Sequence, residues 1–234
     1  YLWFEWRIPG LLKKYKADLF LSPDGFSSLS TKVPTCLVIH DLAFEHYPEH
    51  FKLSHKLYWR KYSPLFARKA TRIATVSTFS KNDIAARYNV TPDNIDVVYN
   101  GAHAEYRPLG WEEREAVKQK YAEGCEYFVF AGALHPRKNI VNLLKAFVKF
   151  KKMQRSNMKL VIVGRLAWKY EEVMEMREEM PFKEDVKWVG YMGVEELSKV
   201  MGAAYALVYA SQFEGFGIPI LVAYQCNVPA IVSN

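Results

Sequence analysis

The chain has 234 residues, half of them hydrophobic, which is enough for one large domain or two small ones with packed cores. No run approaches the roughly 18 apolar residues of a membrane-spanning helix, and the opening segment contains Glu5 and Arg7 where a signal peptide would be apolar. We therefore expect a globular, cytoplasmic protein. The cysteines Cys36, Cys125 and Cys226 lack the spacing of a zinc site or a disulfide framework, so we expect small buried side chains.

The charge balance is basic, with 32 Lys and Arg against 25 Asp and Glu, a formal charge of +7. This excess favours an anionic partner. The positive charges are dispersed in short pairs such as Lys13-Lys14 and Lys151-Lys152, without a long basic arm. Bulk charge therefore does not choose between nucleic acid, anionic lipid and a phosphorylated small molecule.

In the first half of the chain, short β-rich apolar runs alternate with segments of helical period, a pattern typical of parallel sheets. The predicted strands cover residues 17–22, 35–40, 72–77 and 95–100, and the predicted helices cover residues 55–69 and 80–88. Ser77 or Thr78 is expected to cap the second helix.

The alternation breaks over residues 100–113, which hold Gly101, Pro108 and Gly110 and precede a polar helix. Clustered glycine and proline residues interrupt regular structure. We therefore expect one domain over residues 1–105 and a second over residues 106–234.

The second half begins a new series of strands. They are predicted over residues 126–132, 158–164, 186–190, 204–210 and 228–233, and the clearest helix covers residues 139–152. Five strands with intervening helices predict an α/β fold with a doubly wound sheet. The last predicted strand ends the chain, and no element follows to cover it, so we expect a piece of a longer protein.

In the common doubly wound order 3-2-1-4-5, the first and fourth strands are neighbours and ligands bind beyond their carboxyl ends. Two loops should therefore meet there. After the first strand comes GALHPRKN, residues 132–139, and after the fourth comes SQFEGFG, residues 211–217. Both loops lead into helices, whose first turns present unpaired N–H groups and a positive dipole end.

The side chains of these loops favour a phosphate attached to a sugar. Arg137 and Lys138 suit a diphosphate, whereas the Glu214 carboxylate suits the hydroxyls of a neutral polyol. Gly215 and Gly217 would let backbone amides approach that group closely. The alternative at this point is that the basic pair is solvated and that Glu214 only caps a helix.

The motifs together resemble the GT-B glycosyltransferases of family GT4, retaining enzymes that move a sugar from a nucleotide donor. The likeness covers nearly the whole chain and lies in the segments VIHDLAFEHYPE, ATVSTFSKNDI, VVYNGAHAEYRPL, GALHPRKNI, SQFEGFGIPILVA and VPAIVS. It implies two Rossmann-like domains facing a cleft, with the acceptor held mainly by the first and the donor nucleotide by the second. It also implies that the first domain's opening sheet and the second domain's closing helices are missing here.

Residue by residue, the resemblance implies that Arg137 and Lys138 bind the donor diphosphate and that Glu214, the first Glu of the EX7E motif, lies near the hydroxyls of the donor sugar. It also implies that His40, at the end of a first-domain strand, faces that sugar. A lone His at a strand end is otherwise more often structural. The donor-binding positions that it implies are Gly132, Gly215, Phe216, Gly217 and Val222.

The sequence departs from the family pattern at three positions. Val222 replaces the second Glu of EX7E, which would grip the ribose hydroxyls, and it can accept no hydrogen bond. Asn227 stands where many relatives have Gly, and Ala133 where many have an additional phosphate-binding Arg. Losing one hydrogen bond costs about 0.5–1.5 kcal/mol. We therefore expect weaker donor binding rather than none.

Two other interpretations are disfavoured. A metal site is not expected in the cluster of His40, Asp41, Glu45, His46, Glu49, His50 and His55, because it lacks a compact ligand signature and prolines interrupt it. The aromatic residues of YLWFEWRIPG and KLYWRKY are expected in the core or the cleft, since no RNA-binding strand pattern accompanies them.

The resemblance thus implies a retaining hexosyltransferase that needs no metal or other cofactor. Its donor substrate would be a GDP- or UDP-linked sugar, with mannose favoured by the HPRKN loop. Its acceptor would be a saccharide or a lipid-linked molecule, with peripheral contact to an anionic membrane left open. Two alternatives remain. One is a catalytically impaired GT-B-like binding or scaffold protein, and a weaker one is a basic nucleic-acid binder, which predicts a steeply salt-dependent affinity for DNA or RNA. For the favoured transferase we expect no nucleic-acid partner.

Overall fold

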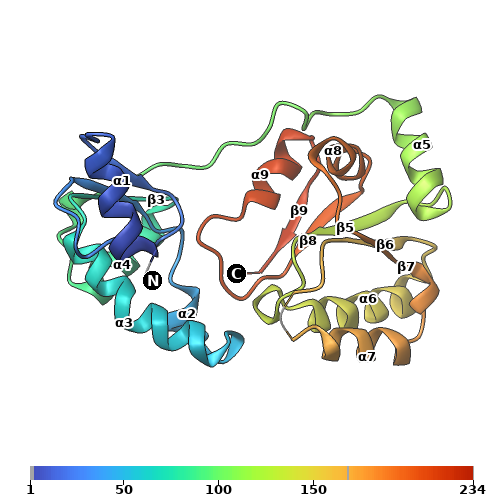
Figure 1. Ribbon diagram of the computed structural model, residues 1–234. Helices are drawn as coiled ribbons and strands as arrows, with labels where there is room; N and C mark the ends of the chain where they lie inside the picture. The colour runs from blue at the N-terminus through green and yellow to red at the C-terminus, as the bar shows by residue number, and fades with distance from the viewer. Residues whose placement is uncertain (1–2, 168, 234) are drawn as a thin grey trace. The chain divides into compact units, whose positions relative to one another are not determined.

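The structure, a computed structural model, describes residues 3–167 and 169–233 (Figure 1). Its contacts divide the chain into two compact units. The first extends to Asn100 and includes Glu214–Phe216, and the second holds Gly101–Phe213 and Gly217–Asn234. Each unit contains a parallel β-sheet with helices, which confirms the predicted α/β class.

The first unit is built on a four-stranded parallel sheet in the order β1-β2-β3-β4. The strands are β1 (Phe20–Ser22), β2 (Thr35–Val38), β3 (Arg72–Thr75) and β4 (Ile95–Val97). The helices are a π-helix (Trp3–Arg7), α1 (Ile8–Lys14), α2 (Ala43–His46), α3 (Leu53–Lys69) and α4 (Thr78–Tyr88), with 3-10 turns at Pro48–His50 and Pro92–Asn94. All four strands lie inside the predicted segments.

Local sequence signals explain how α4 begins and ends. The Ser77 hydroxyl accepts a hydrogen bond from the backbone N–H of Ser80 at 3.1 Å, so Ser77 is the N-cap. The helix ends at Asn89 in the left-handed conformation, which Asn tolerates better than most residues. The α4 residue Ile84 is buried with Leu37 and Ile73 of the sheet, and this packing forms the core of the unit.

The second unit is built on a five-stranded parallel sheet in the order β7-β6-β5-β8-β9. The strands are β5 (Tyr127–Ala131), β6 (Lys159–Val163), β7 (Val186–Gly190), β8 (Ala206–Tyr209) and β9 (Ala230–Val232). Numbered within the unit, this order is 3-2-1-4-5, which confirms the predicted topology. The helices are α5 (Trp111–Ala122), α6 (Ile140–Gln154), α7 (Glu171–Glu179), α8 (Val194–Gly202) and α9 (Ile218–Gln225), with 3-10 turns at Pro136–Lys138 and Lys183–Asp185.

Helices cover both faces of this sheet, with α6 and α7 on one face and α8 and α9 on the other (Figure 1). The core contains fully buried side chains from strands and helices alike, such as Phe130, Leu144 and Leu160. Tyr127 is also fully buried, and its hydroxyl donates a hydrogen bond to the carbonyl of Val200 at 2.6 Å. That bond ties β5 to α8, as a buried hydroxyl requires a partner.

A charged cluster joins α6, β6 and the turn before β7. Asp185 lies 2.7 Å from Lys151 and 2.7 Å from Lys159. Burial alone would raise the pKa of Asp185, but hydrogen bonds from the two lysines hold it below its ordinary value. Lys151 is therefore a buried structural residue and not part of a solvated basic pair.

The expectation of buried cysteines is confirmed for Cys226 and wrong for Cys36 and Cys125, which are partly exposed. Trp3 and Trp6 are 56% and 75% exposed, which leaves only the cleft of the two places expected for them. Within residues 3–167 and 169–233, every helix is too short or too polar to cross a membrane.

Candidate functional site

The loops after β5 and β8 meet, as the predicted topology requires. Arg137 lies in the 3-10 turn after β5, and its guanidinium donates a hydrogen bond to the carbonyl of Phe213 at 3.0 Å. The backbone N–H of Gln212 donates in turn to the carbonyl of Arg137 at 2.8 Å. Two segments more than 70 residues apart are thus joined beyond the carboxyl ends of neighbouring strands.

Lys138 is buried, with 8% of its surface exposed. Its ammonium group donates a hydrogen bond to the Tyr209 hydroxyl and lies 4.8 Å from the centre of the Tyr209 ring. Tyr209 ends β8 and stacks on Phe130 of β5, with the ring centres 6.1 Å apart. The alternative that Lys138 is a solvated residue at a helix start is therefore wrong.

Two glycines leave the neighbouring ends of β5 and β6 without side chains. A Cβ on Gly164 would lie 1.8 Å from the carbonyl oxygen of Gly132, so no other residue fits there. Gly132 itself has a φ of +155°, and a Cβ on it would lie 4.0 Å from Cε of Lys138. The Lys138 side chain therefore runs beside an open stretch of backbone that a ligand could approach.

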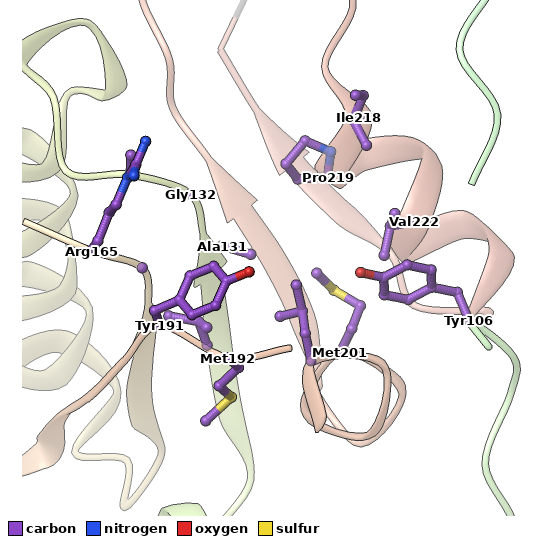
Figure 2. Close-up of a pocket in the computed structure, with 14 residues that line it drawn as sticks. Tyr106, Ala131, Gly132, Arg165, Tyr191, Met192, Met201, Ile218, Pro219 and Val222 are labelled. Atoms are coloured by element: carbon purple, nitrogen blue, oxygen red, sulfur yellow. The ribbon is translucent and has the colours of Figure 1, made fainter. Parts of the chain in front are cut away.

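A cavity of about 470 Å³ opens beside these glycines within the second unit (Figure 2). It lies beyond the carboxyl ends of β5 and β6 and is flanked by α8 and α9. The lining residues are Tyr106, Ala131, Gly132, Ala133, Val163, Gly164, Arg165, Tyr191, Met192, Leu197, Met201, Ile218, Pro219 and Val222. Most of these side chains are apolar, and the polar side-chain groups belong to the two tyrosines and Arg165.

Helix α9 brings its first turn to this cavity. Gly217 is the N-cap residue with a φ of +90°, a conformation that favours glycine. Pro219 has no N–H group, and the N–H of Ile220 bonds to the carbonyl of Gly217 at 2.9 Å. The helix start therefore offers a ligand fewer amides than the full N-terminal turn that we expected.

Val222 is 4% exposed and lines the same cavity. Its methyl groups stand where the family pattern has a carboxylate, so the cavity lacks that acceptor. Asn227, the other departure next to α9, has a φ of +57°. Asn is the residue after Gly that best tolerates this region, which explains how it replaces Gly. Ala133 lines the cavity, where an Arg would have added charge.

The segment Glu214–Phe216 groups with the first unit. Glu214 is half-buried, and Phe216 lies 6.2 Å from the Tyr99 ring, centre to centre. Gly215 is buried, and a Cβ on it would lie 2.4 Å from the carbonyl oxygen of His40. Gly215 is therefore required for close backbone packing, in addition to the amide role that we predicted for it.

The His40 imidazole contacts the segment that follows β1. It is exposed, and its Nε2 lies 3.0 Å from the carbonyl oxygen of Pro23. His40 also lines a small cavity of about 150 Å³ in the first unit, together with Asp41 and Trp59. In the tautomer that carries its hydrogen on Nε2, the ring donates to the Pro23 carbonyl, and Nδ1 is the acceptor.

The nearby acidic and histidine side chains contact one another, and His46 Nε2 lies 2.8 Å from Asp83 Oδ2. Over residues 3–167 and 169–233, no three His, Cys, Asp or Glu side chains group in a way that could hold a metal ion.

Sequence reasoning missed four residues of this region. Arg165 follows Gly164 at a strand end, a signal that could have identified it. Tyr191 follows Gly190 in the same way. Tyr209 lies inside a strand that reads simply as apolar, and Tyr106 comes from the segment before α5, so nothing local to either residue indicated its place.

Two family models together cover almost the whole chain. The model described as Glycosyl transferases group 1 matches residues 112–234, and the model described as Glycosyltransferase Family 4 matches residues 1–106.

Among curated proteins, the chain is similar to O-antigen chain mannosyltransferase B of Escherichia coli, with 30% identity over 95% of this chain and 58% of that protein. It is also similar to O-antigen chain mannosyltransferase RfbU of Salmonella typhimurium, with 32% identity over 85% of this chain and 51% of that protein. The chain thus spans a little over half the length of these relatives.

Solved structures share the fold. WaaG, a glycosyltransferase involved in lipopolysaccharide biosynthesis, matches with a TM-score of 0.77 and 19% identity over 96% of this chain and 62% of that chain. Anabaena HepE in complex with UDP-glucose matches with a TM-score of 0.76 and 17% identity over 97% of this chain and 62% of that chain. On the match to more than half of its residues, the chain belongs to the group 1 glycosyl transferases, with two Rossmann-like sheets of the GT-B type.

Proposed function

We propose that the protein transfers a sugar from a nucleotide-diphosphate donor to a saccharide or lipid-linked acceptor, with retention of the anomeric configuration. Residues 106–234 would bind the donor, and residues 1–105 would serve the acceptor. The observation that carries the proposal is the cavity beside Gly132 and Gly164, which is next to buried Lys138 and the first turn of α9. Exposed backbone, a held cation and a helix start together suit a diphosphate.

Lys138 and Arg137 would act on the leaving group. As the bond between the anomeric carbon and the phosphate oxygen breaks, its electron pair stays on the diphosphate, where two cations already in place stabilise the growing charge. Tyr209 and the Phe213 carbonyl hold these cations, which reduces the reorganisation needed during the reaction. Glu214 would bind hydroxyls of the donor sugar, Gly215 and Phe216 would border it, and His40 would face it.

The acceptor hydroxyl would attack from the face that the diphosphate leaves. Its proton would pass to a departing phosphate oxygen, so that a carboxylate nucleophile and a metal ion are both unnecessary. Inversion of the anomeric centre in the product would contradict this mechanism.

Mannose is the sugar that we favour, because the curated relatives are named mannosyltransferases. HepE was solved with UDP-glucose, so a UDP-linked hexose is the competing donor. A lipid-linked acceptor would place the protein at the cytoplasmic membrane surface, where its charge of +7 favours anionic lipid. Co-sedimentation with anionic but not zwitterionic vesicles would test that placement.

The decisive experiment is a titration of the full chain with GDP and UDP, followed by ligand-observed NMR. We expect saturable binding of one of them, weakened in Lys138→Ala. Lys145→Ala is the matched control, because Lys145 is an exposed lysine of α6. Equal weakening in both variants, or no binding to a folded chain, would overturn the proposal.

Val222 favours a second candidate, a GT-B-like binding or scaffold protein that has lost donor turnover. Val222 removes a carboxylate from the cavity but keeps the core packed, since the residue is only 4% exposed. This candidate predicts a folded protein that fails the GDP and UDP titration and forms no glycosidic product.

A further inference from the structure

Tyr106 is a buried tyrosine whose hydroxyl opens on the cavity. The residue is 6% exposed and belongs to the core cluster of the second unit. Figure 2 shows its ring beside Val222, with the hydroxyl pointing into the cavity. Within the described ranges 3–167 and 169–233, that hydroxyl has no hydrogen-bond partner. A hydroxyl that opens on a cavity and has no partner in the protein is available to a ligand there.

Hydrogen bonds attach the segment that carries Tyr106 to α9. Its backbone N–H bonds to the carbonyl of His103 at 3.2 Å, and the Gln225 side chain donates to the same carbonyl at 3.1 Å. Gln225 ends α9, so the segment that carries Tyr106 is attached to the helix that carries Val222. A tyrosine hydroxyl is protonated at neutral pH and can both donate and accept, and burial raises the pKa of Tyr106 further.

The position of Tyr106 along α9 indicates which part of a ligand it would meet. Val222 follows Ile218 by four residues, so it lies about 6 Å further along the helix axis. A diphosphate at the first turn of α9 would place the next group of a nucleoside diphosphate, the ribose, beside Val222 and Tyr106. A ribose carries hydroxyls that need partners, and Val222 offers none.

The other polar groups of the cavity are less suited to this task. Tyr191 is 80% exposed, and Arg165 is exposed as well. Water competes for hydrogen bonds to exposed side chains, whereas the Tyr106 ring is already held by packing and loses little freedom on binding. Tyr106 is therefore the group that can discriminate between ligands at this point.

We propose that the Tyr106 hydroxyl hydrogen-bonds a ribose hydroxyl of the donor nucleotide and so determines specificity for a ribonucleotide in a cavity where Val222 has no acceptor. The inference rests on the proposed function, because it requires that a nucleoside diphosphate occupies the cavity.

The test compares the full chain with Tyr106→Phe by isothermal titration calorimetry. The ligands are the nucleoside diphosphate that the wild type binds and its 2′,3′-dideoxy analogue. We expect Tyr106→Phe to weaken binding of the ribonucleotide roughly two- to tenfold and to leave the analogue's Kd unchanged. Tyr224→Phe is the matched control and should change neither, because Tyr224 is an exposed tyrosine of α9 outside the cavity lining.

The outcomes separate the two proposals. If the wild type binds neither GDP nor UDP, the proposed function fails and this inference fails with it. If the wild type binds and Tyr106→Phe keeps the wild-type ratio of the two Kd values, only the role of Tyr106 is overturned. A Tyr106→Phe protein that weakens both ligands equally would also overturn it, since that indicates disturbed packing and not a lost ribose contact.

Discussion

Gly164→Ala tests whether the ends of β5 and β6 must lack side chains for the site to form. The added Cβ would lie 1.8 Å from the carbonyl oxygen of Gly132, whereas real Cβ contacts essentially never fall below 3.0 Å. The two backbone segments must therefore move apart by at least 3.0 − 1.8 = 1.2 Å. Hydrogen bonds resist that movement, because Gly132 donates to Val163 at 2.9 Å and Gly164 donates to Gly190 at 2.8 Å.

Two effects should follow from this displacement. Overpacking of this kind costs about 1–3 kcal/mol of stability. Because Gly132 borders both the cavity and Lys138, a shift of this size would also misplace the site, and a displacement of about 1 Å can cost on the order of 100-fold in activity. The loss of activity should therefore exceed what partial unfolding explains.

The assay is thermal unfolding by circular dichroism together with nucleotide titration and sugar transfer. Gly101→Ala is the matched control, because a Cβ there would have nothing within 4 Å. A Gly164→Ala protein with wild-type melting and wild-type nucleotide affinity would refute the close approach and its functional importance.

Three further predictions concern single side chains. Lys138→Ala should raise the activation free energy of sugar transfer by about 2.7–4 kcal/mol. Wild-type turnover in that variant would contradict the role of Lys138 in stabilising the leaving group. Asp185→Asn should lower the free energy of unfolding by about 3 kcal/mol, because buried Lys151 loses its carboxylate partner and keeps the Met158 carbonyl, and urea denaturation would measure this loss. The pKa of Asp185 in the folded protein lies below its ordinary value of 3.8, so the stabilisation by its carboxylate is complete above pH 3.8 and is lost as the pH falls through the folded pKa. A stability difference between wild type and Asp185→Asn that stays constant on acidification would contradict this. Ser77→Ala should cost about 0.5–2 kcal/mol by removing the cap hydrogen bond to Ser80, and an unchanged urea midpoint would contradict it.

The sequence by itself determined the strands, and the common doubly wound topology predicted their order in the second unit. Each strand is a short apolar run whose neighbours are turns and helices, so local propensity and period decide it, and β5 to β9 fall inside the predicted segments. That topology also predicts that the loops of Arg137 and Phe213 meet, as the hydrogen bond between them confirms. Such rules succeed because parallel strands put all their carboxyl ends at one edge.

Tertiary structure decided the contacts within the site. Lys138 reads as an exposed charge in sequence, but Tyr209, 71 residues later, buries it by packing across two strands. Tyr106 lies in the segment before α5 and reaches the cavity only because α9 holds that segment. These contacts join residues whose spacing follows no period, so packing in three dimensions, and not local propensity, selects them.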